Sequence, residues 1–597
     1  MITLGISAFY HDSAAAIVRD GKIVAAAQEE RFSRIKGDAA FPKLAVGYCL
    51  NEAGVNLDGV DFIGFYDKPL LTFNRLLETY IAFAPRGFGS FATAIPIWVK
   101  EKILQKGLIH RELEALDRGK VRSDRILFDF HHHSHAASAF YPSPFEEAAV
   151  LIMDGVGEWA TTSLGVGKDD EVTLLREIRF PHSLGMLYSA FTYYLGFKIN
   201  DGEYKVMGLA PYGEPRYVDV IRDNLIDVKK DGSFRLDMEY FNYCTGLTMT
   251  NSRFDSLFDA PRRDPAAPLD QFHMDIARSL QAVTEEVVLA LCRGLHAETR
   301  LNALCLAGGV ALNCVANGRI LREGPFEKLW IQPAAGDAGG ALGVALTLCH
   351  VAGDVKRSRA ANIADGMNGS YLGPAYSPAE IRGALDRFGA VYEESTEDRV
   401  IEAAARALAS EKIVGWFQGR MEFGPRALGN RSILADARSP RMQRVLNLKT
   451  KYRESFRPFA PAVRRDEVAE HFELDDDSPY MLIVAQVAKR HMREMNAAEK
   501  ARTGLDRLDV VRSDLPAITH VDGSARVQTV HAETNPSFHR LLGKFKSLTG
   551  CGVLVNTSFN VRDEPIVCSP EDAYRCFMAS EIDMLVLGNF ILRKEAQ

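Results

Sequence analysis

The stretch ITLGISAFYHDSAAAIVRDGKIVAAAQEERF (residues 2–32) indicates the fold from which the chain starts. An apolar run reaches Tyr10, and the polar triplet His11, Asp12 and Ser13 follows it directly. A second apolar run leads into Asp20-Gly21, a dipeptide typical of two-residue hairpin turns, and a third run continues to residue 32. We therefore expect a strand that delivers polar groups at its end, followed by two further strands.

The same plan recurs in AVLIMDG (149–155), ATTSLGVG (160–167), KDDE (168–171) and VTLLREIRF (172–180). Here the first strand delivers Asp154. A repeated strand, polar turn and hairpin is typical of the duplicated nucleotide-binding architecture of actin, hexokinase and Hsp70, in which two similar α/β halves close on phosphates and a metal. The two copies share little sequence, so the interpretation rests on the pattern alone.

Two histidines four residues apart lie in DFHHHSHAASAFYP (129–142). On a helix, His131 and His135 share one face one turn apart, which suits two ligands of a divalent metal. Asp154, and Asp337 in the glycine-rich turn QPAAGDAGGALG (332–343), are the acids that would complete the site. Imidazole with carboxylate favours Fe or Mn, whereas structural zinc would favour cysteine. Without the two aspartates, HxxxH would more often be a solvated helix face or a satisfied core pair.

Paired glycines follow apolar strands at two places. The segment 270–299 has the spacing of a long helix and leads into the strand ALCLAGG, in which Gly308 and Gly309 precede another helix. A second pair occurs in GDAGGALG (336–343). Such turns allow the backbone to approach a phosphate or ribose. Tight packing is the alternative explanation.

Composition restricts the classes of protein. The chain has 597 residues, 47% hydrophobic and 25% charged, which is ordinary for a globular protein of several domains. A net charge of −7 without a basic tail argues against nucleic acid as a partner. Nine scattered cysteines without a CxxC pair fit reduced thiols. With no signal peptide and no long apolar run, we expect a cytoplasmic protein that does not enter a membrane.

A change to Gly, Ser, Asn and Pro at 351–378 predicts a linker, so we place the domains at 1–360 and 361–597. The segments 377–389 and 396–411 then read as capped helices, and 412–419 as a buried strand. The second domain is thus also α/β.

A basic segment stands out in this acidic chain. Between Arg420 and Arg457 there are ten Lys or Arg residues against three acids. Several lie in turns beside glycine, proline and phenylalanine, where guanidinium groups suit phosphate oxygens. A solvated basic helix explains Arg438, Arg441 and Arg444 equally well. Further on, His520 and Arg526 lie in a hairpin-like segment. In CGVLVNTSFNVRDEPIV (551–567) we expect a buried strand that ends in Asn556, Thr557, Ser558 and Asn560. Those small polar groups fit either a base or phosphate contact or a satisfied turn.

With these segments identified, the chain resembles the O-carbamoyltransferases of nodulation-factor and antibiotic (tobramycin-type) biosynthesis. The matching blocks, in order, are YHDSAA, AQEERFSRIKGDAAFP, HHHSHAASAF, MDGVGEW, EYKVMGLAPYG, AGGVALN, GDAGGALG, FGPRALGNRSILAD, RESFRPFAP, RVQTV, NTSFN and EPIV. They extend from residue 10 to residue 567, so the resemblance covers essentially the whole chain.

The resemblance implies an actin-like (ASKHA) N-terminal domain, similar to the threonylcarbamoyl-transferring subunit of the tRNA-modification machinery, and a YrdC-like C-terminal domain. It implies that the second domain converts carbamoyl phosphate and ATP into carbamoyl adenylate and pyrophosphate. The first domain would then move the carbamoyl group to a hydroxyl of a small-molecule acceptor, a sugar or natural product, and release AMP. Fe(2+), or another divalent metal such as Mn, and Mg(2+) with ATP are the implied cofactors.

The resemblance also assigns residues. The metal ligands would be His131, His135, Asp154 and Asp337; His133, where the family commonly has an apolar residue, is a departure. Lys36 matches a lysine near the adenylate, and His11 is the candidate for removing the acceptor's proton. The residues expected at adenosine and at phosphates are Lys205, Gly208, Gly308, Gly309, Asn313, Arg426, Lys451, Arg453, Arg457, Arg526, Asn556, Ser558 and Asn560.

Two other functions remain open. An actin-like sugar kinase would explain the duplicated hairpins, and a nucleotide-gated binding protein would too, but neither uses the histidine pair or the basic segment. For a transferase, the aromatic and apolar segment 66–120 is the expected lining of the acceptor pocket, which favours an acceptor less charged than an aminoglycoside. The general base and the identity of the acceptor stay open, and an oligomer is compatible with the sequence.

Overall fold

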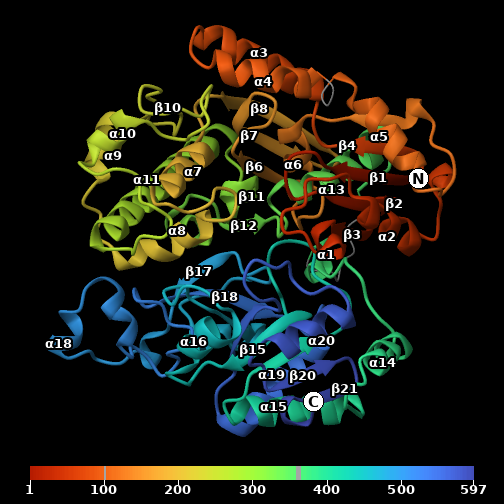
Figure 1. Ribbon diagram of the computed structural model, residues 1–597, viewed down its shortest axis with the longest axis vertical. Coiled ribbons are helices and arrows are strands. Elements are labelled where there is room, and N and C mark those ends of the chain that lie inside the picture. Colours follow the sequence, from red (N-terminus) through yellow and green to blue (C-terminus); the bar gives the residue numbers. More distant parts are fainter. Residues whose placement is uncertain (100–102, 358–364) are drawn as a thin grey trace. The chain divides into compact units, whose positions relative to one another are not determined.

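The computed structural model describes residues 1–99, 103–357 and 365–597 and divides them into two compact units (Figure 1). Unit 1 comprises Met1–Glu29 and Gly37–Gly366, and unit 2 comprises Glu30–Lys36 and Met367–Gln597. The expected domain boundary at 360/361, and that part of the expected linker, fall within 358–364, outside the described residues. Residues 100–102 of the expected acceptor segment also lie outside them.

Unit 1 contains two five-stranded sheets with the same topology. The first has the order β3-β2-β1-β4-β5, and the second has the order β8-β7-β6-β11-β12. In each, three strands form an antiparallel meander and two further strands run parallel to the first. The strands are β1 (Ile2–Ser7), β2 (Ala14–Arg19), β3 (Lys22–Gln28), β4 (Phe62–Phe65), β5 (Ile126–Phe128), β6 (Glu147–Met153), β7 (Ala160–Lys168), β8 (Glu171–Arg179), β11 (Ala303–Ala307) and β12 (Lys328–Ile331). The predicted duplication is therefore confirmed, and unit 1 has the actin-like fold.

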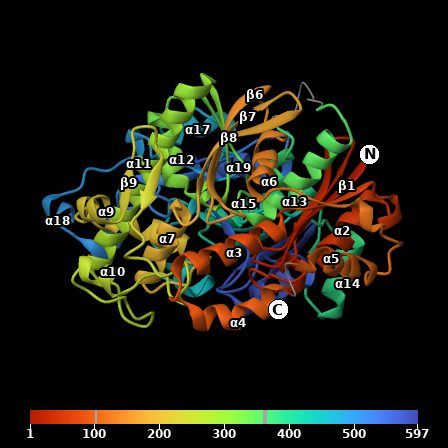
Figure 2. The ribbon, with the colours of Figure 1, turned by 90° about the horizontal axis from the view of Figure 1, so that it is seen from above.

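The helices of unit 1 cover these sheets in two groups. They are α2 (Lys43–Ala53), α3 (Pro69–Phe83), α4 (Phe88–Trp98), α5 (Gln105–Glu114), α6 (His131–Phe140), α7 (Leu184–Tyr194), α8 (Glu203–Leu209), α9 (Val218–Asn224), α10 (Ser252–Leu257), α11 (Gln271–Thr299), α12 (Cys314–Glu323) and α13 (Asp337–Thr347). Figure 2 shows α7, α9, α10 and α11 on one side and α2 and α5 on the other. The short hairpin of β9 (Ile226–Val228) and β10 (Phe234–Leu236) follows α9. The long helix predicted for 270–299 is confirmed as α11, capped by Asp270.

The helices α6 and α13 pack against each other with almost no space between them. A Cβ added to Gly343 would lie 1.7 Å from the carbonyl oxygen of Ser134 on α6, and one added to Gly5 of β1 would lie 1.8 Å from that of Ala341. The prediction of a second glycine turn at GDAGGALG is therefore wrong. The segment is the start of α13, and its glycines allow helix and sheet to approach closely instead of exposing backbone to a ligand.

Unit 2 is an α/β domain built on a nine-stranded mixed sheet of order β13-β21-β20-β14-β15-β19-β16-β18-β17. Its strands are β13 (Glu393–Glu394), β14 (Val414–Phe417), β15 (Arg431–Asp436), β16 (Ala460–Arg464), β17 (Ile483–Gln486), β18 (Ser524–Val530), β19 (Val553–Ser558), β20 (Met584–Leu587) and β21 (Phe590–Arg593). Its helices are α1 (Glu30–Ser33), α14 (Pro378–Arg387), α15 (Glu397–Ala409), α16 (Met442–Val445), α17 (Val468–His471), α18 (Ala497–Lys500), α19 (Pro536–Thr549) and α20 (Pro570–Ala579). Apolar residues of α15 and α19 pack with the sheet around Trp416. The likeness to YrdC-type domains stays a prediction.

The segment 30–36 belongs to unit 2 although its neighbours on both sides belong to unit 1. The expected strand through QEERF is wrong beyond Gln28, because Glu30–Ser33 forms the short helix α1. Arg31 donates to the carbonyl of Gly424 at 2.9 Å, and Arg34 donates to the carbonyls of Pro565 and Ile566 at 2.9 and 2.6 Å. These charge-assisted hydrogen bonds attach the segment to unit 2. No helix in the described ranges has the length and hydropathy that crossing a membrane requires.

Candidate functional site

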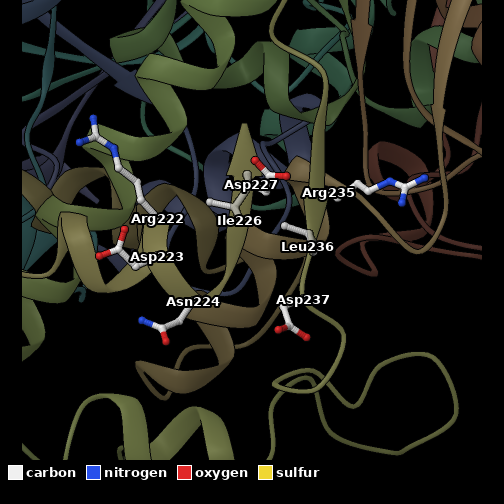
Figure 3. A pocket seen from close by; sticks show the side chains of 8 residues that line it. All are labelled: Arg222, Asp223, Asn224, Ile226, Asp227, Arg235, Leu236 and Asp237. Atoms are coloured by element: carbon white, nitrogen blue, oxygen red, sulfur yellow. The ribbon is translucent and has the colours of Figure 1, made fainter. Parts of the chain in front are cut away.

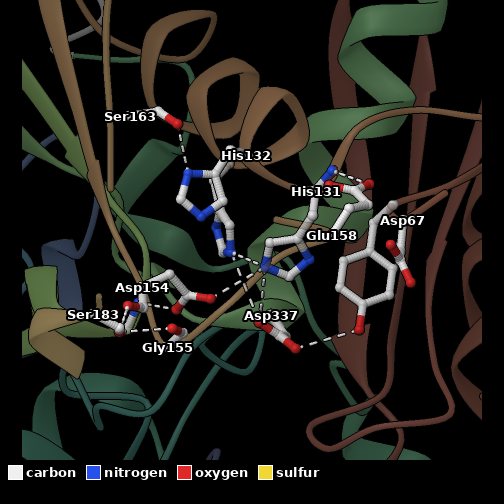
Figure 4. A network of polar contacts seen from close by, with 12 residues as sticks. Asp67, His131, His132, Asp154, Gly155, Glu158, Ser163, Ser183 and Asp337 are labelled. Carbon is white, nitrogen blue, oxygen red and sulfur yellow. Dashed lines mark hydrogen bonds and ion pairs between the residues drawn. The ribbon is translucent and has the colours of Figure 1, made fainter. Parts of the chain in front are cut away.

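Four side chains from three separate parts of unit 1 converge on one point (Figure 4). His131 and His135 lie one turn apart on α6, Asp154 follows the last residue of β6, and Asp337 is the first residue of α13. One ligand atom from each lies within 4.8 Å of the others. His131 Nε2 is 3.2 Å from Asp154 Oδ2 and 3.1 Å from His135 Nε2, and both imidazoles are 3.7 Å from Asp337 Oδ1. The predicted set therefore comes together.

This geometry fits a divalent cation. All four residues are at least nine-tenths buried, so two carboxylates and two imidazoles face one another with little water. Burial opposes a charge on His131, but Asp154 and Asp337 raise its pKa to about 10. The imidazoles in turn hold the pKa of Asp154 well below its usual value despite burial. Buried charges of this kind are stable when they are paired or bind a metal, and a His2Asp2 donor set suits Fe or Mn.

The hydrogen-bond partners of His132 and His133 distinguish these two residues from the ligand His131. His132 Nδ1 lies 2.7 Å from Ser163 Oγ, and His133 Nδ1 lies 2.7 Å from Asp129 Oδ2. Burial and the charge of His131 lower the pKa of His132 to about 3, so this ring stays neutral. The choice of 131 and 135 over 133, made from spacing, agrees with these contacts.

Further residues orient the four ligands. The backbone N–H of Gly309 donates to Asp154 Oδ1 at 2.8 Å, Tyr66 donates to Asp337 Oδ2 at 3.3 Å, and the N–H of His131 donates to Glu158 Oε1 at 2.9 Å. Each aspartate thus keeps its other oxygen toward the cluster. Sequence reasoning missed Tyr66 and Glu158. Nothing in the residues around Tyr66 marks it, whereas Glu158 lies in the quoted block MDGVGEW and was within reach.

The glycines at 308 and 309 have a structural task at this position. Gly308 has a φ of +87°, and a Cβ there would lie 2.3 Å from the carbonyl oxygen of Met153. The close approach delivers the amide of Gly309 to Asp154. Whether this turn also contacts a nucleotide stays a prediction.

The other predicted residues of unit 1 lie as follows. His11 Nε2 is 3.8 Å from Asp337 Oδ2, beside the cluster, while its Nδ1 is 3.0 Å from Asp12 Oδ2. Asn313 caps α12 and exchanges two hydrogen bonds with Gln281, at 3.0 and 3.1 Å. Lys205 lies on α8 with its Nζ 5.8 Å from the ring centre of Phe197, and Gly208 is buried in the same helix.

Unit 2 gathers several of the predicted phosphate-binding residues. Lys451, which is 3% exposed, donates through Nζ to the carbonyl of Ser558 at 2.7 Å, to its hydroxyl at 3.1 Å and to the carbonyl of Asn560 at 2.8 Å; the side-chain oxygen of Asn560 is a fourth acceptor. Arg453 Nε donates to Asn447 at 2.7 Å, and its guanidinium lies 4.7 Å from the ring centre of Phe459.

These groups form a concentration of positive charge. Burial, Arg453, Arg457 and Lys36 lower the pKa of Lys451 well below its usual value. Burial, Arg457 and Arg526 do the same to Arg453. We call these five residues, Lys36, Lys451, Arg453, Arg457 and Arg526, the cation cluster. Lys36 is exposed and the other four are buried or half-buried, and like charges gathered in this way favour a bound anion.

Other predicted basic residues have structural partners. Arg420 donates to the carbonyls of Leu372 and Gly373 at 2.6 and 3.1 Å. The fully buried Arg431 donates to those of Gln418 and Pro374 at 2.7 and 2.8 Å. The interpretation of turn arginines as phosphate ligands is therefore wrong for Arg431, whose guanidinium is surrounded by carbonyls. Arg426 lies five residues earlier, in the loop between β14 and β15.

The polar residues predicted at the end of the strand near residue 556 lie in different places in the structure. Asn556 lies inside β19, where its amide donates to Gln528 at 2.6 Å and to the carbonyl of Ala427 at 3.3 Å. Ser558 ends the strand and Asn560 follows it, and both meet Lys451. The end of β19 thus belongs to the cation cluster, and Asn556 supports it from within the sheet.

A surface cavity of about 260 Å³ lies elsewhere in unit 1, between α9 and the β9–β10 hairpin (Figure 3). Exposed charged side chains such as Arg222, Asp227 and Arg235 line it. Arg222 pairs with Glu286 across the surface of the unit. None of the predicted site residues lines this cavity.

Comparison with known proteins identifies the family. A family model described as "Carbamoyltransferase N-terminus" matches residues 2–346, and one described as "Carbamoyltransferase C-terminus" matches residues 405–594. The uncharacterized protein sll1178 of Synechocystis sp. is 60% identical over 597 residues, covering 100% of this chain and 97% of that protein. The nodulation protein NolNO of Sinorhizobium fredii is 38% identical over 98% of this chain and 79% of its own length.

A relative named for its reaction matches half of the chain. The 3'-hydroxymethylcephem-O-carbamoyltransferase of Streptomyces clavuligerus is 35% identical over 49% of each protein. Among solved structures, component A of the (R)-2-hydroxyglutaryl-CoA dehydratase of Acidaminococcus fermentans covers 59% of this chain and 99% of its own, with 15% identity and a TM-score of 0.31, too low to support a functional argument. The two family models together span both units, and on these matches the chain belongs to the carbamoyltransferase family of enzymes.

Proposed function

We propose that the protein is an ATP-dependent O-carbamoyltransferase that works in two steps. In the first, carbamoyl phosphate, ATP and water give carbamoyl adenylate, pyrophosphate and inorganic phosphate. In the second, a hydroxyl of a small-molecule acceptor attacks the carbamoyl carbon, and AMP leaves. One observation carries this proposal: the chain has two chemically different sites, a buried His2Asp2 cluster in unit 1 and the cation cluster in unit 2.

The first step is assigned to unit 2. The cation cluster, with Arg426, holds the phosphate oxygens of carbamoyl phosphate and ATP, and Mg(2+) accompanies the nucleotide. Ser558 and Asn560 position the ammonium of Lys451, and Asn556 supports the end of β19. Phosphoryl and adenylyl chemistry depends mainly on positioning and on neutralising charge, which this cluster supplies without a side-chain nucleophile.

The second step is assigned to unit 1. His131, His135, Asp154 and Asp337 would hold Fe(2+) or a similar divalent metal, which supplies a Lewis acid for a carbonyl or phosphate oxygen. His11, 3.8 Å from Asp337, is the candidate that accepts the acceptor's proton. Gly308, Gly309 and Asn313, with Lys205 and Gly208, are the proposed surroundings of the adenosine.

The relatives support transfer to a hydroxyl. One of them is named for O-carbamoylation of a 3'-hydroxymethylcephem, which is a small molecule with a hydroxyl group. The acceptor of this chain is proposed only as a hydroxyl-bearing sugar or natural product.

Half-reactions separate the two steps. His135→Ala should keep pyrophosphate release from ATP and carbamoyl phosphate and lose AMP release with carbamoylated acceptor, whereas Arg426→Ala should lose both. His133→Ala is the matched control, since that ring contacts Asp129 instead of the cluster. Equal loss of both steps in His135→Ala would contradict the assignment. Release of ADP with a sugar, in place of pyrophosphate, would favour a kinase.

A further inference from the structure

The helix α3 (Pro69–Phe83) has its polar and apolar faces reversed relative to an ordinary surface helix. Its most buried side chains beyond Pro69 are Thr72, Arg75 and Thr79, each 8–9% exposed. Its exposed side includes Leu70 at 63% and Ile81 at 74%. A helix that covers a core normally turns its apolar stripe inward. The inward polar face of α3 is therefore suited to line a polar space.

Arg75 is the charged group on that inward face. The residue is 8% exposed, and its Nε atom is buried with no hydrogen-bond partner among the residues that the structure describes. The ring centre of Phe180 lies 5.1 Å from its Cζ. Burying a polar donor without a hydrogen-bond partner is costly, and a bound ligand is one way to remove that cost.

The nearest carboxylates are already engaged by other donors. Asp67 accepts from the hydroxyl of Thr72 at 2.9 Å. Glu158 accepts from the backbone N–H groups of Lys68 and His131, each at 2.9 Å. Both acids raise the pKa of Arg75 against the lowering effect of burial, and their hydrogen bonds named above go to other donors. The hydrogen bonds given above for Asp67 and Glu158 therefore do not satisfy the guanidinium of Arg75.

Arg75 lies on the same side of unit 1 as the His2Asp2 cluster. The link is Glu158, which accepts hydrogen bonds from the backbone N–H of Lys68, directly before α3, and from that of His131, each at 2.9 Å. Tyr10 also lies beside the cluster, since its ring is 4.7 Å from that of His11 and His11 is 3.8 Å from Asp337. Tyr10 is 60% exposed, so the surface beside His11 is accessible to solvent.

We infer that Arg75 binds an oxyanion, a carboxylate or a phosphate, of a substrate that reacts at the His2Asp2 cluster. The inference rests on the proposed function in that the cluster is taken as the place of carbamoyl transfer. A guanidinium offers two parallel donors to such a group. The oxyanion has two sources: the phosphate of the adenylate, or an anionic group on the acceptor. An acceptor with an acidic group would still agree with the expectation that the acceptor is not a polycationic aminoglycoside.

Binding measurements on wild type, Arg75→Met and Arg75→Lys distinguish these sources. In the phosphate arm, AMP and adenosine are titrated by calorimetry. If the adenylate supplies the oxyanion, Arg75→Met should lower the affinity for AMP at least 10-fold and leave the affinity for adenosine within twofold of wild type. The affinity of Arg75→Lys for AMP should lie between those of wild type and Arg75→Met. In the carboxylate arm, glucuronate and glucose are titrated. A loss confined to glucuronate assigns the oxyanion to the acceptor. No Arg75-dependent difference in either arm overturns the inference.

Two controls exclude a structural role and separate this inference from the proposed function. Arg86→Met removes an exposed arginine just beyond α3 and should leave every affinity unchanged. Thermal unfolding of Arg75→Met should match or exceed that of wild type; a lowered midpoint, together with equal loss of adenosine and AMP binding, would mean that the arginine only holds the fold. Pyrophosphate release should be the same in wild type and Arg75→Met. If wild type released no pyrophosphate, the proposed function would be wrong, but the AMP titration would still decide whether Arg75 binds a phosphate.

Discussion

The helix α13 packs tightly against α6 at Gly343, opposite Ser134, and substitution of Gly343 tests how the cluster is assembled. Ser134 precedes His135 on α6, and Gly343 lies on α13, whose first residue is Asp337. In Gly343→Ala the new Cβ would lie 1.7 Å from the carbonyl oxygen of Ser134, whereas ordinary contact begins at 3.4 Å. The two helices must therefore separate by about 1.7 Å, or deform, to accept one methyl group.

The consequence for metal binding follows from ligand geometry. Metal–ligand distances tolerate deviations of about 0.2 Å, so even a quarter of this displacement would move Asp337 out of reach of a cation held by His131 and His135. We expect the affinity for Fe(2+) or Mn(2+) to fall by about 100-fold or more, beyond the 10- to 100-fold typical of lost supporting contacts. Overpacking should also lower the free energy of unfolding by about 1–3 kcal/mol.

The assay is competition for the metal between the purified protein and a chelator of known affinity, with thermal unfolding measured in parallel. Gly47→Ala is the matched control, because Gly47 lies in α2 and a Cβ there meets nothing within 4 Å. That variant should keep wild-type affinity and gain about 0.5–1 kcal/mol in stability. If Gly343→Ala were folded and bound metal within threefold of wild type, the convergence of α6 and α13 would not control the site.

Three further results are expected. Gly308→Ala should lower the free energy of unfolding by more than about 1 kcal/mol, because its φ is +87° and its Cβ would lie 2.3 Å from the carbonyl of Met153; unchanged denaturant unfolding would contradict this. Inorganic pyrophosphate should raise the thermal midpoint by neutralising the cation cluster, and Arg453→Ala should at least halve the shift, whereas an equal shift in both proteins would place the anion elsewhere. Because the folded pKa of Lys451 is lowered from 10.5, the folded state binds that proton less tightly than the unfolded chain, so its contribution to stability rises with pH up to about 10.5. The free energy of unfolding of wild type, relative to that of Lys451→Met, should therefore increase from pH 7 to pH 9. A difference that does not change with pH would contradict the lowered pKa of Lys451.

Local patterns were enough to predict much of the molecule. The two hairpin turns at Asp20-Gly21 and Asp169 have the positive φ angles that such turns need, and the strands around them follow from alternating and apolar runs. The spacing of His131 and His135 depends only on the period of a helix, so it was legible without any structure. The duplicated sheets and α11 were predicted for the same reason.

Contacts between distant segments could not be predicted from these local patterns. The glycines of 336–343 carry the same letters as a nucleotide turn, and only the presence of α6 against them shows that they serve helix packing. Nothing in the local sequence distinguishes Arg431 from Arg426, and only the structure shows that Arg431 donates to the carbonyls of Gln418 and Pro374. Residues 30–36 follow a strand of unit 1 but are held by carbonyls of unit 2.

By itself, then, the amino-acid sequence determined which elements form and which side chains can bind a metal, because helix and strand periods and turn preferences act over a few residues. Tertiary structure alone decided which aspartate oxygens meet the two imidazoles, how Gly309 and Tyr66 orient those carboxylates, and that Arg75 is buried on the inward face of α3. Those outcomes depend on burial and on hydrogen bonds between segments far apart in the chain, and burial is a property that only the folded chain possesses.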